Sequence, residues 1–470
     1  MSTEGHETVT PHAPPEAQHG IISESSFKIL ELPGEIVQEA LLFLRPSHIL
    51  HFALTCHHCH DLSVPILNQS IVLAGPKNNS VWQRIGDAAD DPRNIYVRVV
   101  QLGTGSMARF LEDFWILESV VPRLKTFPQL QGLVSRAPNV GWQGYETIIK
   151  ALGDRLRSLR LEVLAPNGTT LEEVPWIHEY SFSRLHTLDL CFVAPVVKND
   201  TPNILPILST TCPVLKHLKI SFEASRFLQF KIYDSDPVQM ALPGNHLPFL
   251  ESFSLDAADS DPEAEESAMG IHAFLERHSA TLREFAIPYL RRKLESGAPL
   301  HLKLRKLNCS LKLAYQLSEC DDLENATLLE DIALHRICFP SFGIAGPVPS
   351  VGGTSNVDSD VLEERWRYKN VKSLTMFPQT GDQSSLFYQL LPRLFPKLRK
   401  LTLHLYGGTQ SQNLVQEWNT VARNTVVDRC YHLDRVKTIT EGEAKLVEKW
   451  FKVIRDSEGR AMALDAVESH

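Results

Sequence analysis

No long run of apolar residues occurs anywhere in the 470-residue sequence. A helix that crosses a bilayer needs about 20 predominantly apolar residues, so the sequence predicts no membrane association. The first residues lack the basic and apolar regions of a secretory signal, and we expect a cytoplasmic or nuclear protein. An excess of positive charge is also missing, since 47 Lys and Arg stand against 56 Asp and Glu. General nucleic-acid binding rests on neutralising phosphates, so that class is excluded.

Cysteine is sparse, and its spacing follows no disulfide framework. Eight cysteines are spread over the chain, and no spacing recurs apart from the pair Cys56 and Cys59. With no secretory signal, reduced thiols are expected. Phosphate-binding loops, nucleophile elbows and H-E-x-x-H motifs are absent too. Residues 103–108 follow G-x-G-x-x-A, which resembles a dinucleotide-binding motif. That motif also needs an acidic residue about 20 positions further on, and none stands there, so a turn explains the glycines. We therefore predict no catalytic residues and no cofactor.

A short apolar pattern recurs along most of the chain. The template Φ-x-x-Φ-x-Φ (Φ is apolar) predicts a short strand whose alternate side chains share one face. Helix-like stretches such as 268–280 and 384–395 lie between copies, which indicates stacked β/α units sharing one core. A degenerate copy begins at Leu124. The clear copies begin at residues 97, 156, 185, 215, 250, 282, 304, 329, 371 and 398.

A different pattern precedes the repeats. Residues 27–67 contain three short helical patterns, of which the first carries Ile36, Val37, Ala40, Leu41 and Leu44 on one stripe. Pro33 is tolerated in a first helical turn. The third helix is predicted from about Cys56 to Leu62, before Pro65. About 40 residues cannot bury this much apolar surface alone, so the module needs a partner or packs on the rest of the chain.

Residues 30–62 resemble an F-box without gaps. The resemblance rests on Leu-Pro-x-Glu-Ile from Leu32, Ala-Leu-x-x-Leu from Ala40, Ile49-Leu50, and Ala-Leu-Thr-Cys from Ala53. His48 and Cys59 depart from it, because the family often has Asp and an aromatic residue there. F-box modules bind the Skp adaptor of a cullin-RING ubiquitin ligase. The resemblance thus implies an adaptor-binding surface formed by Leu32, Pro33, Glu35, Ile36, Ala40, Leu41, Leu44, Ile49 and Leu50.

The stretch from Cys56 to His60 matches C-x-x-C-H, a pattern that also suits haem attachment or zinc. In the F-box alignment, Cys56 and Cys59 fall on core positions, and a free cysteine behaves as a small hydrophobe. No second Cys/His pair at plausible spacing completes a zinc site. The expected module core is Leu54, Cys56, Cys59 and Leu62. A metal or haem protein using Cys56, Cys59 and His60 stays open as an alternative.

The predicted fold class is α/β, with a short three-helix F-box followed by an irregular leucine-rich-repeat-like solenoid similar to those of fungal F-box proteins. The expected organisation is a disordered tail (1–26), the F-box-like module (27–67), a linker (68–93), the solenoid (94–430), and a C-terminal helical cap and tail (431–470). The cap follows from the apolar positions Leu446, Trp450, Phe451 and Ile454, which suit a helix.

The sequence thus predicts a non-catalytic substrate receptor of a ubiquitin ligase, with a repeat scaffold lacking any ligase role as the alternative. The target protein is expected on the concave strand face, where an acidic or phosphorylated segment would meet basic residues. The loops 256–267 and 346–364 are the alternative target sites. The candidate target-binding residues are Arg160, His217, Lys219, Lys306, Lys400 and His404.

Overall fold

The computed structural model describes residues 31–73, 92–102, 122, 124–135, 141–163, 180–192, 204–222, 247–257, 271–288, 300–321, 323–335, 366–377, 382–405, 415, 418, 423–441 and 446–467. The chain divides into two compact units, residues 1–68 and 69–470. The predicted tail, the glycine motif from Gly103, the loop 346–364, and the loop 256–267 beyond residue 257 lie outside the described residues.

The first unit contains three helices, α1 (Gly34–Leu41), α2 (Pro46–Ala53) and α3 (His57–Leu67). Val37 and Leu41 pack against Leu62 in a small core, with Leu32, Phe52 and Ile66 at its border. The third helix runs further than predicted and includes Pro65. Proline costs a helix mainly the hydrogen bond that its missing N–H would donate. Asp61, whose carbonyl would have accepted that bond, is exposed, so the lost bond lies on the solvent side of the helix.

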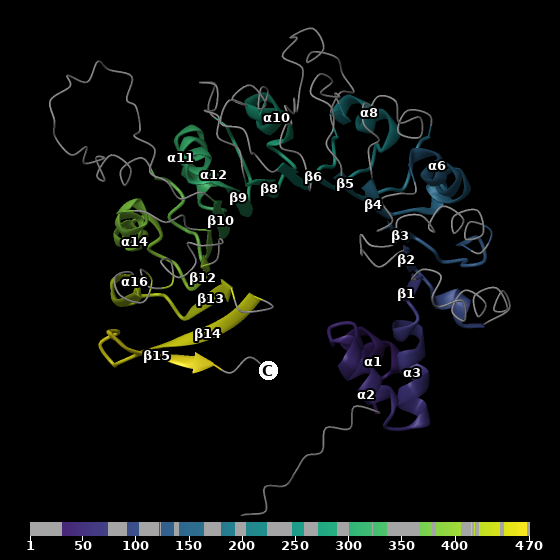
Figure 1. Ribbon diagram of the computed structural model, residues 1–470, viewed down its shortest axis with the longest axis horizontal. Helices are drawn as coiled ribbons and strands as arrows, with labels where there is room; N and C mark the ends of the chain where they lie inside the picture. The colour runs from purple at the N-terminus through teal and green to yellow at the C-terminus, as the bar shows by residue number, and fades with distance from the viewer. Residues whose placement is uncertain are drawn as a thin grey trace, which may run out of the picture. The chain divides into compact units, whose positions relative to one another are not determined.

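In the second unit, the described strands form one sheet whose spatial order equals the chain order (Figure 1). Neighbouring strands are parallel from β1 to β13. One of these strands begins within each of the ten clear sequence copies. The strands are β1 (Ser70–Leu73), β2 (Val99–Leu102), β3 (Gly132–Ser135), β4 (Ser158–Val163), β5 (Thr187–Phe192), β6 (His217–Phe222), β7 (Ser252–Ala257), β8 (Glu284–Ile287), β9 (Lys306–Ser310), β10 (Asp331–His335), β11 (Ser373–Phe377), β12 (Lys400–Leu405) and β13 (Arg435–Glu441).

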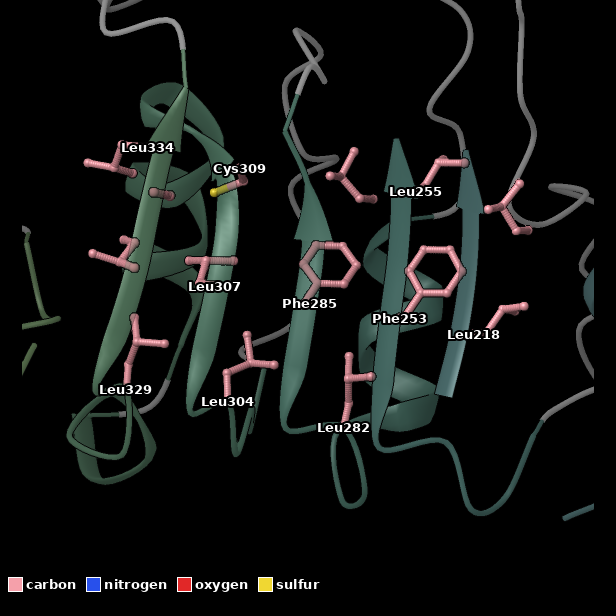
Figure 2. Packing of buried hydrophobic residues seen from close by; sticks show 14 of the residues in the cluster. Leu218, Phe253, Leu255, Leu282, Phe285, Leu304, Leu307, Cys309, Leu329 and Leu334 are labelled. Carbon is pink, nitrogen blue, oxygen red and sulfur yellow. The ribbon is translucent and has the colours of Figure 1, made fainter. Parts of the chain in front are cut away.

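The repeat template corresponds to three rows of buried side chains across the sheet (Figure 2). The first apolar residue stands before each strand; the Leu250 amide, for example, donates to the Leu247 carbonyl at 3.1 Å as the chain turns into β7. The second and third alternate along the strand, as Phe253 and Leu255 do, and both are buried. A single β/α unit could not cover these rows, so the stacked repeats share one core.

Helices connect the strands and lie on one side of the sheet (Figure 1). Phe274 of α10 shows the contact, since its ring centroid lies 4.7 Å from that of Phe253 in β7. We call the opposite side of the sheet the open face. The connecting helices are α6 (Gly141–Leu152), α8 (Ile204–Thr211), α10 (Ile271–His278), α11 (Leu311–Cys320), α12 (Leu323–Ala326), α14 (Asp382–Leu394) and α16 (Arg423–Arg429), with 3-10 turns at Pro92–Tyr96 and Gly153–Arg155.

The predicted C-terminal helical cap is wrong. The segment forms two antiparallel strands, β14 (Leu446–Arg455) and β15 (Ala461–Val467). Aromatic and β-branched residues such as Trp450, Phe451 and Val453 favour strands as much as helices. The unpaired edge of β13 decides the outcome, because its backbone groups gain ladder partners only from a strand. Val453 is buried, so β14 also covers the end of the core.

The strand prediction also missed elements at both ends. The strand β1 lies in the predicted linker, and β13 lies in the predicted cap. The degenerate copy at Leu124 is a turn, and the strand β3 follows it from Gly132. Leu124 is nonetheless fully buried, because the turn packs into the shared core.

Candidate functional site

The first candidate site is the outer surface of the three helices. Each of the first two helices carries a buried stripe beside an exposed one. In α2, Ile49 and Ala53 are buried, whereas Leu50 and Leu54 are 50% and 75% exposed. Residues four apart share a helix face, so both stripes follow from the sequence period. The large apolar side chains exposed on this unit are Ile36, Leu42, Phe43, Leu44, Leu50 and Leu54, which we call the helical apolar surface.

The structure divides the predicted adaptor-binding residues into two groups. Ile36, Leu44 and Leu50 are exposed, and so are Pro33, Glu35 and Ala40. Leu41 and Ile49 are only 2% and 5% exposed, so they stabilise the helices from inside and are not available for contact. Leu32 borders the same core. Sequence reasoning missed Leu42 and Phe43, although two large apolar residues at the end of a helix on so small a module were a usable signal.

The predicted module core is partly wrong. Cys59 and Leu62 are buried as expected, but Leu54 and Cys56 are exposed. Leu54 follows the last residue of α2, where the chain turns away from the core. Cys56 is the N-cap of α3, with extended backbone angles of φ −162° and ψ 168°. Its sulfur therefore accepts a hydrogen bond from the Cys59 amide at 3.4 Å and does not fill a core position.

The second candidate site is the open face, where the polar positions of each strand form rows through the strand register. Arg160, Lys219, Lys306, Lys400 and His404 all stand at such positions, as does His217. Two of these cations are paired by acidic neighbours. The Arg160 Nε lies 3.4 Å from Asp189 Oδ2, and the Lys306 Nζ lies 2.6 Å from Glu284 Oε1. These two side chains are therefore less available to an acidic partner than the sequence suggested.

Another group of cations lies on the open face between β12 and β14. Lys400 pairs in register with Arg435, and Arg435 pairs in register with Lys452. All three are exposed, and none of them forms an ion pair among the described residues, although Asp465 lies in register with Lys452 on its other side. Like charges opposite one another in a sheet are unfavourable. We call these three residues the basic row; the sequence missed Arg435 and Lys452 because they lie on strands that were not predicted.

Beside the basic row, His404 belongs to a stack of three rings. Phe377 lies between His335 at 3.9 Å and His404 at 4.1 Å, measured between ring centroids, and both pairs are nearly parallel. Burial and the nearby Lys437 ammonium lower the pKa of His404, because both disfavour the charged imidazolium. The neutral ring therefore stacks here without adding to the positive charge of the row.

A hollow of about 410 Å³ opens on the same face over β7 to β11. Small side chains such as Ser254, Ala286 and Ala333 line its floor, so another chain could approach the sheet closely. The Asn308 Oδ1 is buried at the floor and has no hydrogen-bond partner among the described residues. A buried acceptor without a partner is costly, which makes this atom a candidate contact for a donor from a bound chain.

Comparison with known proteins adds little. No family model and no curated protein matches the chain. Among solved structures, it is similar to a chain in the crystal structure of the Rad7 and Elc1 complex in yeast, with 12% identity and a TM-score of 0.32 over 78% of this chain and 92% of that chain. A TM-score this low decides neither fold nor function.

The described residues contain no group of three or more His, Cys, Asp and Glu that could hold a metal ion. None of the described helices has the length and apolar character that a bilayer crossing requires.

Proposed function

We propose that the chain is a substrate receptor of a Skp-cullin-F-box type ubiquitin ligase. The observation that carries the proposal is the helical apolar surface, which leaves large apolar side chains in water on a unit that has a core of its own. Exposed apolar patches of this kind mark sites of protein association. The F-box resemblance of residues 30–62 supports the Skp adaptor as the partner. The receptor itself does no covalent chemistry and works in the cytoplasm or nucleus.

The second half of the proposal concerns the target protein. An acidic or phosphorylated segment of the target binds the basic row of Lys400, Arg435 and Lys452, which would relieve the repulsion among three adjacent cations. The same segment continues over the small side chains of the hollow, where a backbone N–H of the target donates to Asn308 Oδ1. The receptor then raises the local concentration of the target near the transfer site.

Adaptor binding is tested with two variants of the full chain. Replacing both Ile36 and Leu50 by Ala removes two exposed apolar side chains without touching the core. Buried aliphatic anchors contribute about 1.5–3 kcal/mol each on association, so adaptor binding in a pull-down or by calorimetry should be lost. The matched control replaces Glu39 and His51 by Ala, which are exposed polar residues on the same two helices.

The control variant should bind the adaptor like the wild type. Equal adaptor affinity of the wild type and the Ile36/Leu50 variant would contradict the docking surface. A wild-type chain that does not bind the adaptor at all would favour the alternative, a repeat scaffold with no ligase role.

A further inference from the structure

Two cysteines in the first unit have the arrangement of a reactive dithiol. Cys56 and Cys59 are both free thiols, and their sulfur atoms are 3.4 Å apart. Cys56 is exposed at the N-cap of α3, whereas Cys59 is 2% exposed in the first turn of that helix. A disulfide has sulfur atoms about 2.05 Å apart, so small side-chain movements would close this pair. Because Cys56 is exposed, it does not serve as a core residue.

The surroundings give the two thiols different reactivity. The Cys59 amide donates to the Cys56 sulfur and lowers the pKa of the Cys56 thiol, with the Cys59 thiol hydrogen bond adding to the effect. The positive end of α3 acts in the same direction. Burial raises the pKa of Cys59. An exposed sulfur that ionises easily beside a buried, protonated one matches the roles of attacking and resolving thiol.

Three of the other described cysteines contrast with Cys56 because they are buried. Burial raises the pKa of Cys212 to about 12 and that of Cys430 to about 12. Cys309 is fully buried, and its pKa is raised as well. These thiols are shielded and stay protonated, so they act as small apolar core residues. Among the described cysteines, this contrast makes Cys56 the thiol that meets an oxidant first.

We propose that Cys56 and Cys59 form a redox-active dithiol that is reversibly oxidised to an intramolecular disulfide by low-molecular-weight disulfides such as oxidised glutathione. The Cys56 thiolate attacks one sulfur of the oxidant, a mixed disulfide forms, and one glutathione leaves as the thiolate. Cys59 then gives its proton to solvent and attacks the Cys56 sulfur, and the second glutathione leaves. Two protein thiols are oxidised while one disulfide is reduced to two thiols.

This inference does not depend on the proposed ligase role. Disulfides in a reducing compartment are usually transient and redox-sensing, which fits a pair that closes and reopens. A zinc site is the competing use of such a pair, but the described residues offer no group of three or more ligands.

The experiment equilibrates the reduced full chain with defined ratios of oxidised and reduced glutathione, traps free thiols by alkylation, and maps them by peptide mass spectrometry. We expect one disulfide, between Cys56 and Cys59, formed with loss of two hydrogen atoms and reversed by excess reduced glutathione. The variant Cys59→Ser should stop at the mixed disulfide on Cys56. The variant Cys56→Ser should remain unmodified at Cys59.

A second measurement does not require either variant to fold. In the wild type, the rate of alkylation at Cys56 is followed against pH, with a short cysteine peptide as the reference. Cys56 should react faster than the peptide at neutral pH. The proposal is overturned if no disulfide between Cys56 and Cys59 forms at any ratio, or if Cys56 reacts no faster than the peptide.

Discussion

Arg435 lies directly opposite Lys452 in the β13–β14 ladder, on the open face of the sheet. Lys400 flanks Arg435 on the other side. The chain thus keeps three cations in adjacent register positions, an arrangement that reduces the stability of the free protein and suits an anionic partner. This opposition between stability and binding gives the first prediction.

The variant Arg435→Glu should be more stable than the wild type but should bind its target more weakly. It replaces two like-charge neighbours by two opposite-charge neighbours, each worth about 0.2–1 kcal/mol. Thermal unfolding and target affinity are measured together at low salt, where surface charges act most strongly. The control Arg429→Glu makes the same charge change at the end of α16, on the helix side of the sheet. Unchanged target affinity in the first variant would rule out the basic row.

The second prediction separates the core of the first unit from its surface. Leu41→Ala removes a side chain that is 2% exposed and should cost about 2–5 kcal/mol in the free energy of unfolding of this unit. Phe43→Ala removes one that is 85% exposed and should change stability by no more than about 0.5 kcal/mol. Its adaptor affinity should nonetheless fall. Denaturant unfolding and adaptor calorimetry give the two readouts, and a large loss of stability in Phe43→Ala would contradict the structure.

The third prediction concerns the hollow. Ala333→Trp places a large ring over the floor between β9 and β11. Target affinity should fall because the ring occupies the space and covers Asn308, whereas adaptor binding should stay unchanged. The control Ala333→Ser keeps the hollow open. If Ala333→Trp binds the target like the wild type, the target does not use this part of the sheet.

The fourth prediction concerns pH. The pKa of His404 is lowered in the folded state, whereas the unfolded chain has a value of about 6.5. As the pH falls below about 6.5, the unfolded state binds a proton and the folded state does not. The stability that His404 contributes above pH 6.5 is therefore lost as the pH falls towards the lower folded-state pKa. His404→Tyr keeps a ring next to Phe377 and should lose less stability than the wild type between pH 7.5 and pH 5.5. Thermal unfolding of both proteins across this pH range gives the readout, and an equal loss of stability in the two would contradict the prediction.

The fifth prediction concerns the end of the sheet. The Arg455 guanidinium in β14 donates to the Cys430 carbonyl at 2.6 Å and to the Gly459 carbonyl at 3.0 Å, which ties β14 to the end of α16 and to the turn before β15. Arg455→Met should cost about 1–3 kcal/mol, because carbonyl groups lose a charged donor. Amide exchange should become faster in β13 to β15. Arg460→Met removes an exposed guanidinium that pairs with Asp456 and Glu458 and should have little effect.

The sequence predicted the interior of the sheet well because one spacing rule determines which residues are buried. The prediction failed where a polar residue takes an apolar position or where a contact with another strand decides the structure. In β13, the third apolar position is Thr438, which is buried although polar, so the template does not match. In β14, the choice between helix and strand depends on the free edge of β13, a contact that no local pattern contains. Cys56 was misassigned because cap and core positions differ by backbone angles, not by residue type.

The identity of spatial order and chain order in the sheet has a consequence for how the protein is made. Each described strand after the first pairs with the described strand that was synthesised before it, so none of them waits for a segment that the ribosome has yet to add. Contacts between nearby parts of the chain form quickly. The growing chain can therefore add one repeat after another during translation, and until the last strands arrive the newest strand is the edge most exposed to chaperones.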